Sequence, residues 1–516
     1  MPEPTRAPRG QRRRRRERAT TAETKRQVDY THLRNPFTPQ RVFSEDHIEA
    51  IHLNALRIIQ ELGIRVLLPE GRKYFAQAGA IVDEDTQMVR IGADIIDAAL
   101  ATAPTSFTLK GASLKRDQII EPGVLFFTPG AGAPHVTDLE RGRRPGSLKD
   151  YEEVTKLTQC FDIFAMFSAV VEPQDVPINL RHYSTMSLQL ILGDKPAWVF
   201  ARGTPQVTDC FEMLRLARGL SQEEFNADPY CVTVINTNSP RQLDIPMTQG
   251  IIDFAKASQI SIITPFCLAG AMAPITIAGA MSLQHAEALA GITLCQTVNP
   301  GAPVMYGSFL SNVDMKSGSP AFGTPEQIKG TLGSGQLARR LGLPWRSAAG
   351  SASNINDVQA ANENQMSLWG AVLAQATNIK HAAGWLEGGL TVSYEKLITD
   401  IEALQIIAEM CTPVEADSAA LGFADIAQVE PGGHFFSAGQ TMERYTSEFY
   451  EPLVADWSNF GAWTENGAKT ASERATEIWK QKLAEFESPV TDPSIGESLE
   501  AFISRRTEAG GAPPES

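Results

Sequence analysis

Short apolar or β-branched runs recur eight times along the middle of the chain, each followed by a loop rich in Gly, Pro or Asn and then by a helical pattern. The runs begin about 30 to 44 residues apart, which suits a strand, a helix and two loops. They are Val124–Thr128, Ile163–Val170, Ala197–Ala201, Tyr230–Asn236, Ile260–Thr264, Val304–Ser308, Trp345–Ala349 and Asn378–Gly384. Eight such units predict an α/β protein with a (β/α)8 TIM barrel over residues 123–410.

An open doubly wound sheet is the alternative arrangement of alternating strands and helices. Such sheets usually have fewer strands and bind dinucleotides at a GxGxxG loop after the first strand. Here Gly130-Ala131-Gly132 follows the first run, but His135 stands where the third Gly is required. The sequence therefore favours the barrel and gives only weak support to dinucleotide binding.

The region before the barrel, residues 31–122, has a helical pattern. Apolar residues recur with a period close to 3.6 after Ser44, which is a suitable N-cap, and Gly63 is a suitable stop. We expect a helical N-terminal subdomain here. Residues 1–30 are Arg-rich and almost free of aromatic residues, which predicts a disordered basic tail.

The region after the barrel, residues 411–487, is helical in pattern and rich in aromatic residues. We expect a C-terminal helical cap that covers the barrel or forms a subunit interface. Residues 488–516 end in a Gly- and Pro-rich sequence, which predicts a loose tail.

The distribution of charge restricts the kind of partner. The net charge is −14 over 516 residues, and residues 1–30 carry ten Lys/Arg against four Asp/Glu, which leaves −20 for the remainder. Because residues 31–516 are this acidic, we do not expect a groove that binds nucleic acid. No run of 18 apolar residues exists, and the basic run Arg12–Arg16 precedes polar residues. We therefore expect neither a membrane span nor a signal peptide.

Cysteine and histidine usage is equally restrictive. The six cysteines show no CxxC spacing, which predicts buried, reduced thiols in a cytoplasmic protein. None of the eight histidines lies at metal-ligand spacing from another. We predict no bound metal, although ligands assembled from distant strands stay possible.

In a barrel of this kind, function belongs to the loops after the strands. These loops are dense in Gly, Ser, Asn, Met and Pro, carry few charges, and contain neither a GxSxG elbow nor a P-loop. His381 follows the eighth run, and its alternative role is that of a core histidine bonded to a backbone carbonyl. The segment Ser347–Glu363 carries amides and carboxylates, and there the alternative is a turn that enters a helix, with Asn356 or Asp357 as its cap.

Several segments, in colinear order from about residue 30 to 487, resemble the trimethylamine methyltransferase (MttB-type) superfamily. They are Leu125-Phe126-Phe127 with its Gly-rich loop, Asp314 to Gly318 through Phe322 to Glu326, Asn356 to Ala360, Ala382 to Leu390, and Pro431 to Phe435. The resemblance implies a (β/α)8 barrel that passes a methyl group from a methylamine to the cobalt of a corrinoid. It implies that a small separate carrier protein holds this corrinoid (cobalamin).

Archetypal members of this superfamily carry pyrrolysine near the segment that corresponds to Gly350 to Gln359. Every position here is one of the twenty common residues, so the chain resembles the branch without pyrrolysine, which includes glycine betaine methyltransferases. A tertiary amine would leave as an amide-like anion unless an electrophile captured its nitrogen. A quaternary ammonium leaves as a neutral tertiary amine, so we expect a quaternary amine such as glycine betaine as the substrate.

The expected reaction is an in-line displacement, for which the protein supplies orientation and desolvation. Aromatic faces attract a trimethylammonium group, and the candidates at strand ends are Phe266, Tyr306 and Trp385. Candidates for holding a betaine carboxylate are His381, Asn236 and Asn354. Asp357 or Glu387 could balance the cation, and no catalytic residue is assigned beyond these two.

Two other functions stay open from the sequence. A lyase or aldolase acting on a small carboxylate would use a Schiff-base lysine, for which Lys380 and Lys316 are available. The other open function is that of a protein that binds a betaine and catalyses no reaction. We expect the chain to form a homo-oligomer.

Overall fold

The computed structural model describes residues 29–514, so the basic tail that we predicted for residues 1–30 lies almost wholly outside the described residues. The chain forms two compact units. One comprises residues 30–411 and 453–516, and the described part of the other is Asp29 with residues 412–452. Across the described part of the chain, no helix is both long and apolar enough to cross a membrane.

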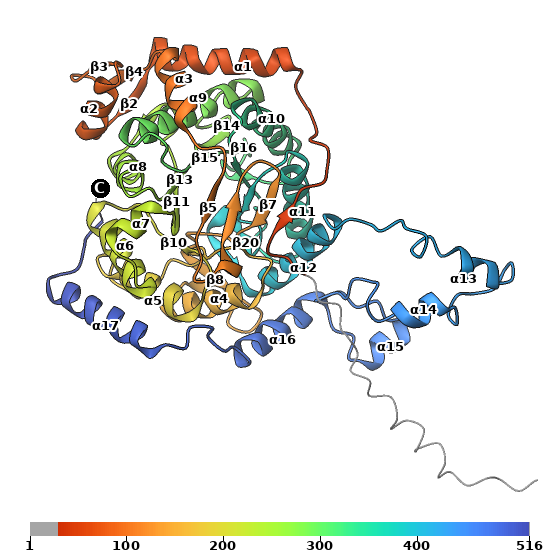
Figure 1. Cartoon of the computed structure of the whole chain (residues 1–516). Helices are drawn as coiled ribbons and strands as arrows, with labels where there is room; N and C mark the ends of the chain where they lie inside the picture. Colours follow the sequence, from red (N-terminus) through yellow and green to blue (C-terminus); the bar gives the residue numbers. More distant parts are fainter. Residues whose placement is uncertain (1–28, 515–516) are drawn as a thin grey trace, which may run out of the picture. The chain divides into compact units, whose positions relative to one another are not determined.

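The larger unit is built on a curled sheet of mixed α/β type, with its strands at the centre of a ring of helices (Figure 1). Within residues 29–514 the sheet has eight strands. In spatial order they are β1 (Leu33–Arg34), β7 (Val124–Phe127), β19 (Asn378–Lys380), β18 (Trp345–Ala348), β15 (Val304–Gly307), β13 (Ile260–Ile263), β11 (Cys231–Ile235) and β10 (Ala197–Trp198). All neighbouring pairs are parallel except β1 with β7, and the seven parallel strands coincide with seven of the eight predicted runs.

The exception is the second run, Ile163–Val170, which forms no regular strand. It makes a single parallel bridge, from Phe127 to Phe164, and the amide of Phe167 donates to the carbonyl of Pro196 at 3.0 Å. The amide of Ala165 donates to the carbonyl of Phe127 at 3.2 Å, whereas the amide of Val170 turns back to the carbonyl of Ser168 at 2.8 Å. The prediction of a regular strand is wrong here, because the bonds of this segment to its neighbours are isolated and do not continue as a ladder.

The helices that follow the strands surround the sheet (Figure 1). They are α4 (Leu148–Cys160), α5 (Arg181–Leu192), α6 (Thr204–Arg218), α7 (Gln222–Ala227), α8 (Ile245–Lys256), α9 (Ile277–Val298), α10 (Pro325–Leu341), α11 (Val358–Leu373) and α12 (Tyr394–Met410). Helix α9 is buried on nearly all sides because the N-terminal helices α1 and α3 cover it from outside. A helix in that position can be apolar all round.

The N-terminal region contains strands as well as the predicted helices. Ser44 caps α1 (Glu45–Arg57), and Gly63 ends the π-helical turn that follows, at a φ of 78°. The helices α2 (Pro69–Gln77) and α3 (Ala93–Thr102) alternate with short strands. These strands are β2 (Ile64–Val66), β3 (Ile81–Asp83), β4 (Met88–Arg90), β5 (Phe107–Leu109) and β6 (Gln118–Ile120). A purely helical region was therefore a wrong expectation, because three-residue strands are too short to show a period in the sequence.

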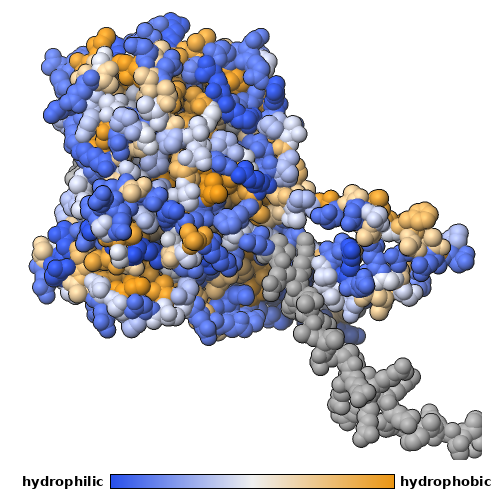
Figure 2. Space-filling model, in the orientation of Figure 1, coloured by the Kyte–Doolittle hydropathy of each residue, from blue (hydrophilic) through white to orange (hydrophobic). Residues whose placement is uncertain are grey.

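The C-terminal region contains the expected helices, distributed over both units. Helices α13 (Phe423–Gln428) and α14 (Gly439–Arg444) belong to the smaller unit, and large apolar side chains are visible on its surface in Figure 2. In the larger unit, α16 (Ala471–Ala484) packs against α12 and α4, after the short α15 (Phe460–Glu465). Residues 488–516 are not loose throughout as predicted, because α17 (Pro493–Glu508) packs on α5 and α6 through buried Leu499 and Phe502.

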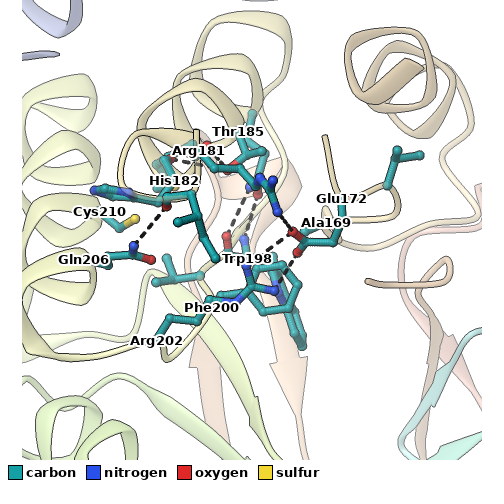
Figure 3. A pocket seen from close by; sticks show the side chains of 15 residues that line it. Ala169, Glu172, Arg181, His182, Thr185, Trp198, Phe200, Arg202, Gln206 and Cys210 are labelled. Carbon is teal, nitrogen blue, oxygen red and sulfur yellow. Dashed lines mark hydrogen bonds and ion pairs between the residues drawn. The ribbon is translucent and has the colours of Figure 1, made fainter. Parts of the chain in front are cut away.

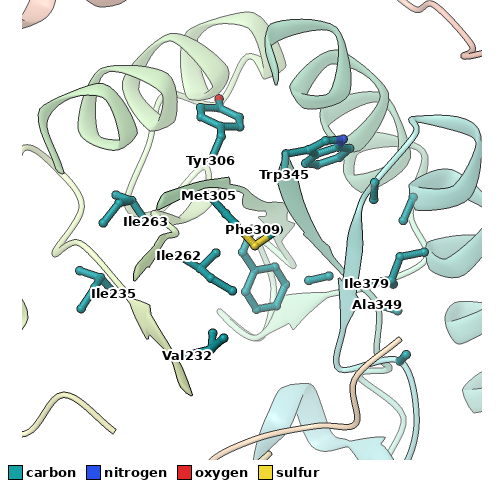
Figure 4. Packing of buried hydrophobic residues seen from close by; sticks show 14 of the residues in the cluster. Val232, Ile235, Ile262, Ile263, Met305, Tyr306, Phe309, Trp345, Ala349 and Ile379 are labelled. Atoms are coloured by element: carbon teal, nitrogen blue, oxygen red, sulfur yellow. The ribbon is translucent and has the colours of Figure 1, made fainter. Parts of the chain in front are cut away.

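Alternation along each strand gives the sheet an inner side and a side that faces the helices. Figure 4 shows Ile262, Met305 and Phe309 toward the inner side, whereas Tyr306 and Trp345 point to the helices. Arg346 follows Trp345 and therefore faces inward. Lys380 lies one residue beyond the outward-facing Ile379 in β19 and faces inward as well. The interior of the sheet is thus apolar apart from a few polar side chains, which mark the candidate site.

Candidate functional site

An aromatic cluster lies at the carboxyl ends of the strands, with Phe309 at its centre. Phe266 at the start of β14 (Phe266–Ala269) meets Phe309 edge to face at 4.8 Å between ring centroids. Phe322 lies 5.7 Å from Phe309, and Trp385 lies 6.0 Å from it. Four aromatic rings from the connections after β13, β15 and β19 therefore converge at one end of the sheet, and we call Phe266, Phe309, Phe322 and Trp385 the aromatic cluster.

Trp385 begins β20 (Trp385–Leu386), and its indole lies in a cradle of three glycines. A Cβ atom added at Gly130, Gly350 or Gly389 would stand 2.8, 2.7 or 2.4 Å from the indole ring. The backbone at Gly389 has a φ of 103°, which side chains rarely adopt. The sequence thus keeps side chains away from the indole on three sides and holds it in one orientation.

His381 stacks on this indole, with centroids 3.7 Å apart and the planes at 7°. It is buried and has a φ of 57°, an unusual backbone conformation for a residue other than glycine. Burial, together with the positive charges of Arg346 and Lys380, holds its pKa well below the usual range. The imidazole is therefore neutral, and its Nδ1 has no hydrogen-bond partner in the described structure.

Arg346 and Lys380 lie on the inner side of the sheet, next to the aromatic cluster. The guanidinium of Arg346 stands 5.6 Å from the ring centroid of Phe309, and the amine of Lys380 stands 3.7 Å from that of Trp198. Lys380 Nζ also donates to Ser168 Oγ at 2.8 Å. Burial lowers the pKa of Arg346 to about 9, and burial with the nearby Arg346 charge lowers the pKa of Lys380 well below its usual value.

The loops that carry these groups are tied together by amide and carboxylate side chains. Asn364 in α11 accepts from the amide of Gly350 at 3.1 Å and donates to the carbonyl of Ala382 at 3.1 Å. Glu363 accepts from the hydroxyl of Ser351 at 2.6 Å. The loops after β18 and β19 are therefore fixed relative to each other before any ligand binds, which favours preorganised binding.

The structure brings three of the predicted site residues together, namely Phe266, His381 and Trp385. Tyr306 does not join them, because it lies on the outer side of β15, where its hydroxyl contacts His285 and Gln284 of α9. The remaining candidates lie in the loops.

Asn236 and Asn354 are exposed. Asp357 is the N-cap of α11 and accepts from the amide of Ala360 at 3.1 Å. Glu387 forms a two-bond ion pair with Arg143, at 2.8 and 2.9 Å, which lowers the pKa of its carboxyl group. Both carboxylates thus have structural partners of their own.

Three residues of this group were missed from the sequence: Phe309, Phe322 and Arg346. Phe309 comes two residues after β15, where the Gly- and Ser-rich character of the loop concealed it. Arg346 could have been identified from the sequence, since it is the single charged residue in the apolar run Trp345–Ala349.

A second polar group lies beside the sheet, in a pocket between α5, α6 and β10 (Figure 3). The carboxylate of Glu172 accepts from Arg181 at 3.1 Å and from Arg202 at 2.7 Å. Trp198 lines this pocket and also contacts Lys380, so the pocket borders the inner group. Among residues 29–514 there is no cluster of three or more His, Cys, Asp or Glu side chains able to hold a metal ion.

Comparison with known proteins gives one consistent family. A glycine betaine methyltransferase of Desulfitobacterium hafniense is 33% identical over 472 residues, which cover 91% of this chain and 98% of that protein. The trimethylamine methyltransferase MttB2 of Methanosarcina mazei is 26% identical, over 91% of this chain and 95% of that protein. A solved structure, the hydroxylamine complex of MtmB, covers 91% of this chain and 96% of that one at 10% identity, with a TM-score of 0.43.

The family description "Trimethylamine methyltransferase (MTTB)" matches residues 9–511, which is nearly the whole chain. This match and the identity of one third to a relative of similar length confirm the resemblance found in the sequence. The chain belongs to the trimethylamine methyltransferase (MTTB) family and is a methyltransferase.

Proposed function

We propose that this enzyme transfers a methyl group from glycine betaine, or a closely related quaternary amine, to the Co(I) of a corrinoid carried by a small partner protein. The observation that carries the proposal is the aromatic cluster around Phe309. Its rings offer faces and edges to a bulky cation at the end of the sheet where barrel enzymes act. The name of the relative at 33% identity agrees with this substrate.

Leaving-group chemistry supports a quaternary amine. Displacement at a quaternary nitrogen releases a neutral tertiary amine and needs neither a general acid nor an electrophile at the nitrogen. The chain carries no pyrrolysine, the residue that the resemblance assigns to members acting on tertiary amines. The neutral His381 has no proton that it must deliver for this reaction, and its stacking on Trp385 gives it a positioning role instead.

The corrinoid, when its carrier is docked, supplies the nucleophilic cobalt. The residues of this chain bind the cation, orient one methyl group toward the mouth of the sheet and exclude water. Phe309 and Trp385 are buried and Phe266 is half-buried, so the cluster is dry on its inner side and reachable at its rim. The nearly uncharged loops around it suit the approach of a second protein surface.

We also propose that the sheet closes as a (β/α)8 barrel, with residues 163–170 in place of the eighth strand. This segment bonds to both edges, through Ala165 to Phe127 at 3.2 Å and through Phe167 to Pro196 at 3.0 Å. A cytoplasmic location fits the six free thiols. A homo-oligomer fits the aromatic side chains of residues 412–452, of which Phe423, Phe436 and Phe449 are each 79% exposed.

A Schiff-base lyase has less support than methyl transfer. Lys380 is buried with a lowered pKa, which such chemistry requires, but its amine contacts Ser168 and the ring of Trp198. Family membership also names a methyltransferase. Reduction with borohydride in the presence of small keto acids should therefore leave the mass of the chain unchanged.

The direct test mixes the purified full chain with reduced free cobalamin and one amine at a time, and follows methylcobalamin by absorbance. We expect methyl transfer from glycine betaine or a related betaine and none from trimethylamine. Turnover of trimethylamine without turnover of any betaine would refute the proposal. Replacing Phe309 with Leu should lower kcat/KM about tenfold, because a cation–aromatic contact contributes about 1–2 kcal/mol in a desolvated site.

A further inference from the structure

The two cationic side chains inside the sheet lack the anionic partners that buried cations normally have. Arg346 is 1% exposed and Lys380 is 2% exposed. Neither forms an ion pair with a carboxylate of residues 29–514. Arg346 has a single long bond, at 3.5 Å to the carbonyl of Ser308, and the ring of Phe309. Buried charges are otherwise paired or bound to a ligand, so this pair is suited to binding an anion.

The polar atoms left without partners around this pair are nearly all hydrogen-bond donors. Arg346 Nε, Trp198 Nε1 and Trp385 Nε1 are buried and lack partners, and each of these atoms can only donate. His381 Nδ1 is the fourth such atom and donates or accepts according to its tautomer. A group of orphaned donors with no orphaned carboxylate suits an acceptor-rich ligand such as a carboxylate.

We propose that Arg346 and Lys380 form a carboxylate subsite that holds the anionic end of the substrate while the aromatic cluster holds its trimethylammonium end. This inference rests on the proposed function and narrows its substrate class to zwitterions. Phe309 joins the two ends, because its ring contacts both Arg346 and the cluster. The two charges of a betaine of this kind are separated by a single methylene, so one short ligand reaches both.

The carboxylate subsite explains why two basic side chains are buried beside the aromatic cluster, which a site for a simple cation would not need. The buried positive charge of Arg346 repels a bare tetramethylammonium ion, and it is balanced only when a carboxylate binds beside it. Choline has the same trimethylammonium end with a neutral hydroxyl, so it would leave Arg346 and Lys380 without an anionic partner. We therefore expect the enzyme to select betaines over choline chiefly through Arg346, with a bidentate guanidinium–carboxylate contact as the source.

The experiment measures binding by calorimetry to the full chain, with glycine betaine, choline and sodium acetate as probes. The wild type should bind glycine betaine at least about 100-fold more tightly than choline. Arg346→Gln should weaken glycine betaine binding about 100-fold and leave choline unchanged, and Arg346→Lys should restore part of the loss. Arg340→Gln is the matched control, since Arg340 pairs with Glu49 on the surface.

Two results would overturn the subsite. One is wild-type binding of choline as tight as that of glycine betaine, which needs no variant. The other result is a ratio of glycine betaine affinity to choline affinity that stays unchanged in folded Arg346→Gln. Should that variant not fold, the same affinity ratio is measured in Lys380→Met. Failure of the proposed function looks different. In that case no betaine would give methylcobalamin, yet acetate would still bind the wild type and bind Arg346→Gln about 100-fold more weakly.

Discussion

Replacing Arg346 with Met should make the ligand-free enzyme more stable, because the guanidinium is held in the fold for a ligand. Burial lowers its pKa to about 9, so it stays charged at neutral pH. That shift corresponds to about 5 kcal/mol by which the fold disfavours the charged form. Methionine has a similar length, carries no charge and fits apolar surroundings.

The substitution also removes favourable contacts. The cation–aromatic contact with Phe309 contributes about 2 kcal/mol, and the long bond to Ser308 contributes about 1 kcal/mol. The net gain is therefore about 2 kcal/mol, within the range of about 1–4 kcal/mol seen when buried ions are replaced by apolar residues. For a chain of this length that gain raises the melting temperature by about 2 °C.

The assay is thermal unfolding of the ligand-free wild type and Arg346→Met, repeated with about 10 mM glycine betaine, which should stabilise the wild type alone. Arg116→Met is the matched control. Arg116 pairs with Asp162 at 2.6 Å and Asp194 at 2.8 Å, so its loss leaves carboxylates unpaired and should destabilise by about 2 kcal/mol. The reasoning is refuted if Arg346→Met melts as far below the wild type as Arg116→Met does.

Three further predictions test other parts of the structure. Gly389→Ala places a Cβ 2.4 Å from the Trp385 indole, so it should shift the tryptophan fluorescence and lower kcat/KM at least about tenfold. Gly123→Ala is the control, because Gly123 has open space around it and its replacement should change neither the fluorescence nor kcat/KM. Burial and the nearby Arg346 charge lower the pKa of Lys380, so between that lowered value and about 10.4 the unfolded chain binds a proton that the folded chain has released. This proton should make wild-type stability rise with pH in that window, and a series of urea midpoints from about pH 7 to about pH 10 should rise less in Lys380→Met. Asp357→Ala should lower the free energy of unfolding by about 1 kcal/mol, and Asp357→Asn should lower it much less, since Asn also caps helices. Equal losses of unfolding free energy in the two variants would contradict the capping role.

Much of the architecture was accessible from the sequence, because local chemistry specifies it. The recurrence of apolar runs predicted seven of the parallel strands, and Ser44 and Gly63 marked the start and end of a helical segment. Phe266, His381 and Trp385 were found because they follow strands, and strand ends meet at one face of such a fold. The second run was mistaken for a regular strand because its apolar composition does not reveal that its bonds to the neighbouring segments are isolated.

The sequence by itself determined the family, the order of strands and helices, and the end of the sheet at which chemistry belongs. Only the tertiary structure decided which side chains face inward. Strands of a parallel sheet that are buried on both sides are apolar throughout, so no alternation in the sequence distinguishes their two sides. For that reason Tyr306 was as suitable a candidate as Phe309 until the fold turned it toward α9. For the same reason, the lone charge of Arg346 gained a meaning only when the sheet placed it beside Lys380, without a carboxylate to pair with.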